Sequence, residues 1–241
     1  MKRFNKNGSH VGVIISFVMF ITFLIFLYLI ITPTINKQKD KSSVLNNLEK
    51  RLIENLSSDL TFLSLKVIAD SGGAQCVNLV NFSIDSEMDF NLVIKDQDGM
   101  TRTAHKKDPE LQIGGNGLNF LKVYNSEEFN ELDDEINQNC EFLIKDEGNY
   151  SFGLMRTQKY VFEKKIFSLL SIYENDYENL KEEFSIPRGS EFAFSFKLNN
   201  GSIIGRNELN LSTSIYEKRI LTAYVDNNTN IVPGYLNIKV W

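Results

Sequence analysis

Two cysteines, Cys76 and Cys140, are the residues of this 241-residue chain with the clearest capacity for chemistry. They lie too far apart in sequence for a redox pair or half of a zinc site, since both place their cysteines a few residues apart. A disulfide between them would close a loop of about 65 residues and contribute roughly 4 kcal/mol in the chain-entropy model. We expect this disulfide if the surrounding domain lies outside the cytoplasm, and two buried free thiols are the alternative.

The other residues that could bind ions or transfer protons form no recognisable constellation. His10 and His105 lack a cysteine or second histidine at metal-ligand spacing. Segment 96–99, Asp-Gln-Asp-Gly, resembles the start of a calcium loop but lacks the downstream ligands, so a hairpin turn is predicted. The glycine-rich segment 114–117 has neither the spacing nor the following helix of a phosphate loop. The acidic run at 127–135 is more typical of a solvated helix face than of a cation site.

These patterns predict a protein with no catalytic residue, metal or cofactor, and therefore not an enzyme. An anchored enzyme that uses a pair of carboxylates is the remaining catalytic alternative. Nucleic acid is not expected as a partner, because the formal net charge is −5 and phosphate binding requires concentrated lysine and arginine.

The element that dominates the sequence is an uncharged apolar segment at 11–32. At ~1.5 Å per residue it extends about 33 Å as a helix, enough to cross a hydrocarbon core of about 30 Å. A cleaved secretory signal has a shorter apolar region and a small-residue cleavage site, which segment 31–34 does not offer. A buried core helix is the other alternative, but the segment has no polar face. We therefore predict one transmembrane helix at 11–32 after a cytoplasmic basic leader at 1–10.

The main domain is expected outside the cytoplasm, with the cell membrane crossed once. Lys2, Arg3 and Lys6 precede the helix and favour a cytoplasmic N-terminus. Basic residues after the helix favour the opposite orientation, although a long following domain weakens their influence. Beyond the helix lie six Asn-x-Ser/Thr sequons, which are candidate glycosylation sites unless they arise by chance in an asparagine-rich chain: Asn55, Asn81, Asn149, Asn200, Asn210 and Asn227.

The segment 33–60 is predicted to be an amphipathic helical stalk. An apolar stripe at helical period indicates a helix over about 41–58, with the stripe at Val44, Leu48, Leu52 and Leu56. Pro33 predicts a kink or break, so the stalk is either a separate helix or the membrane helix continued beyond the proline. The stripe requires a cover, and the domain that follows can supply it.

The rest of the chain, 61–241, is predicted to be a β-rich domain. Alternating or apolar runs between turn signals predict strands at 62–68, 77–84, 90–94, 100–105, 118–124, 141–145, 160–167, 191–198, 202–205, 219–225 and 234–241. Tight turns are predicted at 199–201 and 226–229, and short helices at 126–138 and 176–184. The expected fold class is α+β, with a long N-terminal helix and a mainly antiparallel sheet.

The residues before the apolar helix form a short basic leader that ends in small residues. Lys2 and Arg3 are followed by Lys6-Asn7-Gly8-Ser9, which leads directly into the helix. This arrangement resembles the class III signal peptide of archaeal type IV pilin-like proteins. In that family a prepilin peptidase cuts after a small residue on the cytoplasmic side, the helix is retained, and a β-rich head follows it.

The resemblance implies a cut between Gly8 and Ser9, and it implies other pilin-like subunits and a prepilin peptidase as partners. The family's frequent acidic residue five positions after the cut is replaced here by Val13. In filaments of that family the carboxylate is thought to pair with a neighbouring subunit's N-terminal amine. Its replacement therefore implies a minor, initiating or pseudopilin-like role rather than that of a major filament subunit.

Two functions of different classes are consistent with these features. The first is a membrane-anchored extracytoplasmic structural protein, a pilin-like or minor-pilin-like subunit in contact with membrane lipid and with other subunits. Gly12 and Ser16 form a small-xxx-small pair that permits close helix contact. The alternative is a monomeric membrane-tethered cell-surface binding domain with an uncleaved anchor. The N-terminus of the mature protein distinguishes the two.

Overall fold

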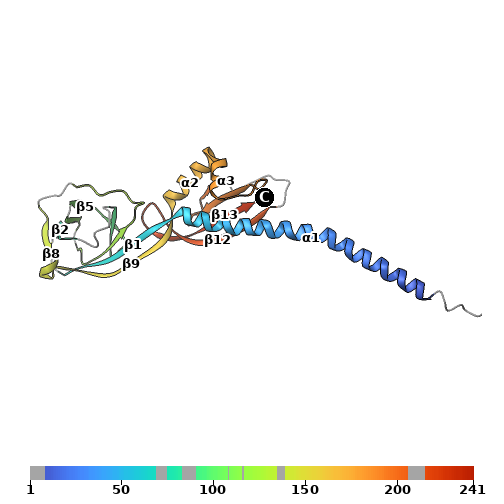
Figure 1. Cartoon of the computed structure of the whole chain (residues 1–241). Coiled ribbons are helices and arrows are strands. Elements are labelled where there is room, and N and C mark those ends of the chain that lie inside the picture. The colour runs from blue at the N-terminus through green and yellow to red at the C-terminus, as the bar shows by residue number, and fades with distance from the viewer. Residues whose placement is uncertain are drawn as a thin grey trace, which may run out of the picture.

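The computed structural model is a long helix that leads into a β-rich head (Figure 1). The structure describes residues 9–68, 75–82, 91–107, 109–115, 117–134, 139–205 and 215–241, and of these it leaves out the side chains of 9, 31–40 and 107. The fold class is the predicted α+β, with an apolar N-terminal helix and a large, mainly antiparallel sheet.

Helix α1 runs from Ser9 to Leu56 as one element of 48 residues. The predicted membrane helix and the predicted stalk helix are therefore continuous. Of the two alternatives stated for Pro33, the membrane helix continued beyond the proline is confirmed, and a separate stalk helix is wrong. A proline removes one backbone donor from a helix, and the strong helical patterns on both sides of it outweigh that loss. Within α1, the segment His10–Ile30 is long and apolar enough to cross a membrane.

Nine strands form one sheet in the order β11-β10-β13-β12-β9-β1-β7-β3-β4. Their bounds are β1 (Ser57–Val67), β3 (Leu92–Asp96), β4 (Thr101–Arg102), β7 (Phe120–Asn125), β9 (Tyr150–Phe162), β10 (Phe192–Lys197), β11 (Ile203–Gly205), β12 (Tyr216–Val225) and β13 (Ile231–Val240). All neighbours are antiparallel except β12 and β9, which are parallel and paired only at Tyr224 with Val161 and Val225 with Phe162. This short join divides the sheet into two parts.

The part beside α1 is here called the proximal lobe, and it comprises α1 from residue 41, α2 (Glu163–Asn175), α3 (Tyr177–Glu183) and β10 to β13. The leucine stripe of α1 is buried in this lobe: Leu48, Leu52 and Leu56 have 0% exposure. They share a cluster with the inward face of the sheet, at Phe192, Phe194, Phe196, Leu236, Ile238 and Val240. Helix α1 after residue 41 is thus a layer of the core, and the domain that follows covers its apolar stripe, as the sequence predicted.

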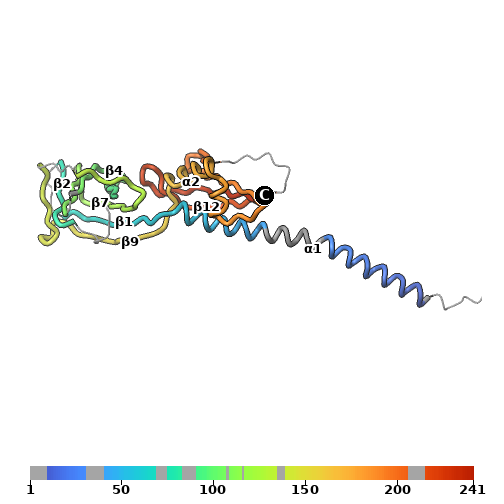
Figure 2. The backbone as a smooth tube through the Cα atoms, turned by 45° about the horizontal axis from the view of Figure 1, so that its top comes forward, coloured from blue at the N-terminus to red at the C-terminus, as the bar shows by residue number. Residues whose placement is uncertain are grey.

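The remaining part is the distal lobe, which a second sheet closes. This sheet has the order β5-β6-β2-β8, with β2 (Cys76–Val80), β5 (Ala104–Lys107), β6 (Glu110–Gly114) and β8 (Glu141–Ile144). Its apolar face packs against β1, β3 and β7 in a second cluster that includes Val77, Leu111, Leu65, Ile94 and Val123. Figures 1 and 2 place this lobe beyond the proximal lobe, at the opposite end from the membrane segment, with β1 and β9 running between the two.

The predicted turns and the C-terminal hairpins are confirmed. Segment 96–99 closes the β3–β4 hairpin, and the turns at 199–201 and 226–229 close β10–β11 and β12–β13. The helix predicted at 176–184 is α3. The described part of the predicted helix 126–138, residues 126–134, forms turns instead. There the carboxylates of Glu127 and Glu128 accept hydrogen bonds from Ser58 Oγ, so they are fixed by tertiary contacts rather than by a helix face.

The strand predicted at 160–167 is wrong beyond Phe162. Strand β9 ends there and α2 begins at the next residue. Four apolar side chains of α2 recur at helical period and pack into the proximal core: Ile166, Leu169, Leu170 and Tyr173. This period, visible in the sequence, outweighs the β-propensity of the preceding residues. Strand β6 and the first part of β9 were not predicted.

Candidate functional site

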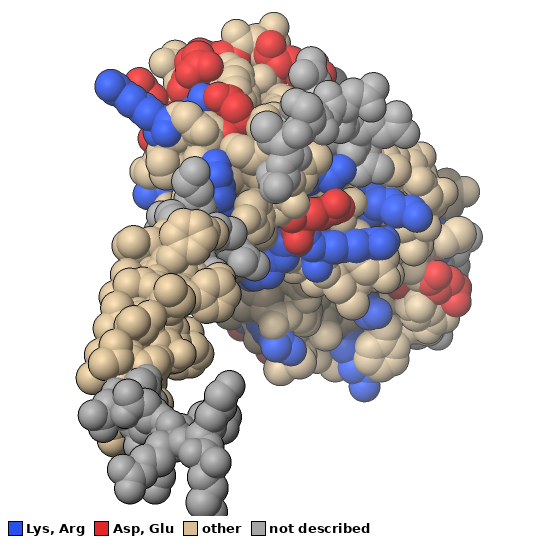
Figure 3. All heavy atoms as spheres, turned by 90° about the vertical axis from the view of Figure 1, so that its right-hand side faces the viewer, with Lys and Arg blue, Asp and Glu red and all other residues tan. Residues whose placement is uncertain are grey.

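The segment His10–Ile30 of α1, which is long and apolar enough to cross a membrane and is here called the membrane segment, is exposed along its length. Every side chain from His10 to Ile30 is exposed except Leu27, which is half-buried, and Val13 is 64% exposed. Figure 3 shows this segment without lysine, arginine, aspartate or glutamate, whereas residues of both charges are scattered over the head. A helix that is apolar on every side requires lipid or other helices around it. Gly8 lies outside the described residues, and Ser9 is the first residue of α1, so cleavage between them stays a prediction.

Polar contacts fasten the other half of α1 to the proximal lobe. Lys41 Nζ donates to Ser190 Oγ at 2.6 Å and to the carbonyl oxygen of Trp241 at 3.0 Å. Further along the helix, Glu49 forms an ion pair with Lys218 of β12. The leucine stripe and these contacts together make α1 and the proximal lobe one unit, so the lobe follows the position of the membrane segment.

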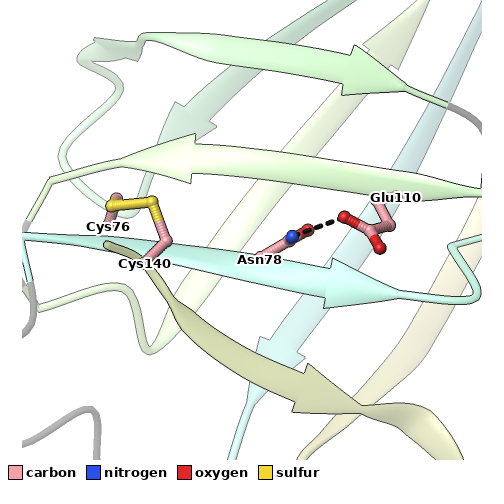
Figure 4. The surroundings of a disulfide bond; sticks show 4 residues. All are labelled: Cys76, Asn78, Glu110 and Cys140. Atoms are coloured by element: carbon pink, nitrogen blue, oxygen red, sulfur yellow. Dashed lines mark hydrogen bonds between the residues drawn. A yellow bond between two sulfur atoms is a disulfide. The ribbon is translucent and has the colours of Figure 1, made fainter. Parts of the chain in front are cut away.

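Cys76 and Cys140 form a disulfide in the distal lobe, as predicted (Figure 4). Their Cα atoms are 4.9 Å apart across a sequence separation of 64 residues. Cys76 begins β2, Cys140 precedes β8, and the adjacent residues Val77 and Glu141 are the first pair of the parallel β2–β8 ladder. The bond therefore holds together the starting ends of two strands that are distant in sequence.

The candidate ion-binding residues take structural roles. His105 lies on β5 in register with Gln112 of β6. Nearby, the fully buried Asn78 donates through Nδ2 to Glu110 Oε2 at 2.6 Å (Figure 4). Among the described residues, no three His, Cys, Asp or Glu side chains gather as a metal site requires. His10 lies on the exposed membrane segment, on α1.

Asp96, the first residue of the calcium-like segment, caps its own hairpin. Its Oδ1 accepts hydrogen bonds from the backbone N–H groups of Asp98 and Met100, both at 2.9 Å, and Arg102 pairs with Oδ2 at 2.6 Å. Burial alone would raise the pKa of the Asp96 carboxyl, but the hydrogen bonds from Met100 and Arg102 outweigh it and hold the pKa below its ordinary value. The carboxylate is thus a charged turn-forming group, as the hairpin prediction required.

A cavity of about 370 Å³ lies where the two lobes meet, lined by residues that include Arg102, Glu128, Phe129, Lys164 and Asp226. The carboxylates on its wall are engaged in the fold. Glu128 contacts Lys165 at 3.6 Å, and Asp226 Oδ1 accepts backbone N–H groups of its own turn at 2.9 and 2.7 Å. The wall therefore carries charges of both signs, and two of its carboxylates, Glu128 and Asp226, are engaged in contacts within the protein.

A second contact between the lobes is made by Lys95 of β3, a residue that the sequence analysis missed. Its Nζ donates to the carbonyl oxygen of Asn228 and to Asn230 Oδ1, each at 2.7 Å, in the β12–β13 turn. Burial lowers the pKa of Lys95, and the nearby Asp226 partly opposes this shift. No signal of this role is present in the sequence for a lysine directly after the predicted strand 90–94, because its partners lie far away in sequence.

The sequons occupy different environments. Asn200 and Asn227 are exposed at the tips of the β10–β11 and β12–β13 hairpins. Asn55 and Asn149 instead donate through Nδ2 to Glu183 and Glu147, at 3.4 and 3.3 Å. Asn81 is exposed in a turn, although the serine of its sequon lies outside the described residues, as does the whole Asn210 sequon. Of the two hairpin sequons, that of Asn200 also has an exposed serine, Ser202, whereas the threonine of the Asn227 sequon, Thr229, is buried at 7% exposure.

Comparison of the chain with protein-family models, with curated proteins and with solved structures gave no match.

Proposed function

We propose that this chain is a single-pass membrane protein with an extracytoplasmic head, and that it serves as a structural subunit of the pilin-like kind. The observation that carries the proposal is the division of α1 between two environments. Residues 10–30 are apolar and exposed, whereas the leucines from 45 to 56 form part of the core of the head. A helix built in this way holds a rigid head at a fixed distance from a membrane or from a bundle of similar helices.

The disulfide supports the extracytoplasmic location, because such bonds persist in oxidising compartments. The basic residues Lys2, Arg3 and Lys6 support a cytoplasmic N-terminus on the other side of the membrane. The proposal includes two further points: the membrane is the cell membrane, and the chain crosses it with its N-terminus in the cytoplasm.

Two small residues on the membrane segment support a role in assembly. A Cβ atom added to Gly12 would meet no other heavy atom within 4 Å. Ser16 lies one turn further along the same exposed face of the helix. Small residues at this spacing let two helix backbones approach closely. With Val13 in place of a carboxylate, the role that fits best is a minor or initiating subunit, processed by a prepilin peptidase between Gly8 and Ser9.

Mass analysis of the N-terminus tests this proposal on protein purified from membranes of its own host. A mature chain that begins at Ser9 is expected, and Gly8→Trp should block the cut whereas Asn7→Ala should permit it. A native chain that begins at Met1 or Lys2 would overturn the pilin-like proposal. That result would favour the alternative, a monomeric binding domain on an uncleaved anchor.

A further inference from the structure

Strand β9 has a long edge to which no other strand of the described chain pairs. Along one side it pairs with β1, from Ser57 with Val161 to Val67 with Tyr150. Along the other side it pairs only with β12, and only at Val161 and Phe162. Residues 150–160 therefore present one row of backbone groups without a strand partner, and Figures 1 and 2 show β9 along the outer rim of the sheet.

The other edges of the two sheets are short or covered. The edge strands β4, β5, β8 and β11 have two, four, four and three residues. Strand β12 also lacks a strand partner over most of one side, and α1 packs on one face of this strand, where Glu49 binds Lys218. Proteins normally shorten or cover their edges because open backbone donors and acceptors recruit further strands. The edge of β9 departs from that rule.

The side chains on this edge are also uncovered on both faces of the sheet. Residues 153–157 are all exposed, including Leu154 at 69% and Met155 at 47%. Arg156 and Lys159 are exposed as well, and neither forms an ion pair with any residue that the structure describes. Residues 150–162 contain no acidic residue. The edge thus combines open backbone groups, two apolar side chains and two cations that form no ion pair with a described residue. Asp59 of β1 lies opposite Lys159 in the ladder, whereas the residue opposite Arg156 is the uncharged Phe62.

We propose that the β9 edge is a docking surface to which an extended, acidic segment of another protein adds as a strand. Backbone hydrogen bonds along β9 supply the general affinity of this kind of recognition, and side chains beside the edge supply its selectivity. Carboxylates of the added segment pair with Arg156 and Lys159, and its apolar residues cover Leu154 and Met155. A second copy of this chain is the poorer occupant, because its own β9 brings the same two cations to the contact.

Hydrogen exchange on the full chain in detergent micelles tests the proposal with two synthetic peptides of equal length. One alternates valine with glutamate, and the other alternates valine with lysine. Near saturation, the acidic peptide should slow exchange over residues 151–160 by roughly tenfold, since it supplies partners to the open edge. The basic peptide should leave this segment unchanged. This comparison uses the unaltered protein and depends on no variant.

Charge reversal provides the second arm. Arg156→Glu should abolish protection by the acidic peptide. The control is Arg219→Glu. Arg219 is an exposed cation of β12 that lies over the ring of Tyr235, and this variant should retain protection of β9 by the acidic peptide. The proposal is overturned if both peptides protect β9 equally, if neither does, or if protection lies elsewhere. It is also overturned if β9 becomes protected at rising protein concentration without peptide, since the occupant would then be a second copy.

Discussion

Removal of the disulfide is the perturbation whose effect follows most directly from the structure. In a Cys76→Ser/Cys140→Ser variant, the 64-residue separation between the two positions is no longer closed by a covalent bond. The chain-entropy relation gives a loss of about 4 kcal/mol for a loop of this length. Whole domains are stable by only about 5–15 kcal/mol, so the distal lobe should lose a large share of its stability.

The loss should be local because of what β8 contacts. It is an edge strand that pairs only with β2, through four residues in parallel register, and Leu143 is its one fully buried apolar side chain. Without the bond, only these few contacts between β2 and β8 hold the two ends of the long loop together. The two lobes have separate hydrophobic clusters, so the proximal lobe should be affected much less.

Two probes report separately on the stability of each lobe, in the full chain in detergent micelles. Amide exchange over β2 and β8 reports the distal lobe, and it should become about a thousandfold faster for a loss of about 4 kcal/mol. Fluorescence of Trp241, the single tryptophan, reports the proximal lobe during urea unfolding and should shift little. The native protein with reductant should reproduce the variant, and the variant itself should not respond to reductant.

Two results would refute this reasoning. Exchange over β2 and β8 within about tenfold of the native rate would mean that the bond contributes little to the closed state. A fluorescence midpoint that falls as far as the stability of the distal lobe would mean that the two lobes unfold as one unit, despite their separate clusters.

Three further substitutions test other parts of the fold. Leu52→Ala should destabilise the proximal lobe by about 2–5 kcal/mol in urea unfolding followed by Trp241 fluorescence, whereas Leu221→Ala, at a 64% exposed position, should change it little. Lys95→Met should cost about 1–3 kcal/mol and speed exchange in the β12–β13 turn, because two acceptors there lose their buried donor. Asp96 has a lowered folded pKa, so its contribution is present above its unfolded pKa of about 4 and disappears as pH falls through the folded value. Acid titration of unfolding should therefore show a smaller loss of stability below about pH 4 in Asp96→Asn than in the native protein.

The sequence predicted best where the deciding interactions are local. The apolar stripe on α1 and the turn at 96–99 each depend on residues within a few positions of one another, and both were confirmed. The strand predicted at 160–167 was wrong because two local patterns in this segment disagree. The helical recurrence from Ile166 to Tyr173 was present in the sequence, but the aromatic and β-branched residues before it suggested a strand.

The sequence was least informative where two distant segments meet. Lys95 and the turn at 226–230 are more than 130 residues apart, and no local pattern marks their contact. The same holds for the open edge of β9. The first part of that strand was not predicted, and whether a strand has one partner or two depends on segments elsewhere in the chain.

The sequence by itself determined an uncharged helix that can span a membrane, the apolar stripe that follows it, and an α+β chain with one pair of cysteines. Those properties arise from composition and from periods of two and 3.6 residues, which backbone geometry imposes locally. Only the tertiary structure decided that α1 is continuous into the core, that Cys76 meets Cys140, and that β9 is left with an open edge. These outcomes depend on which distant surfaces bury one another, and that choice is made by the packing of the whole chain.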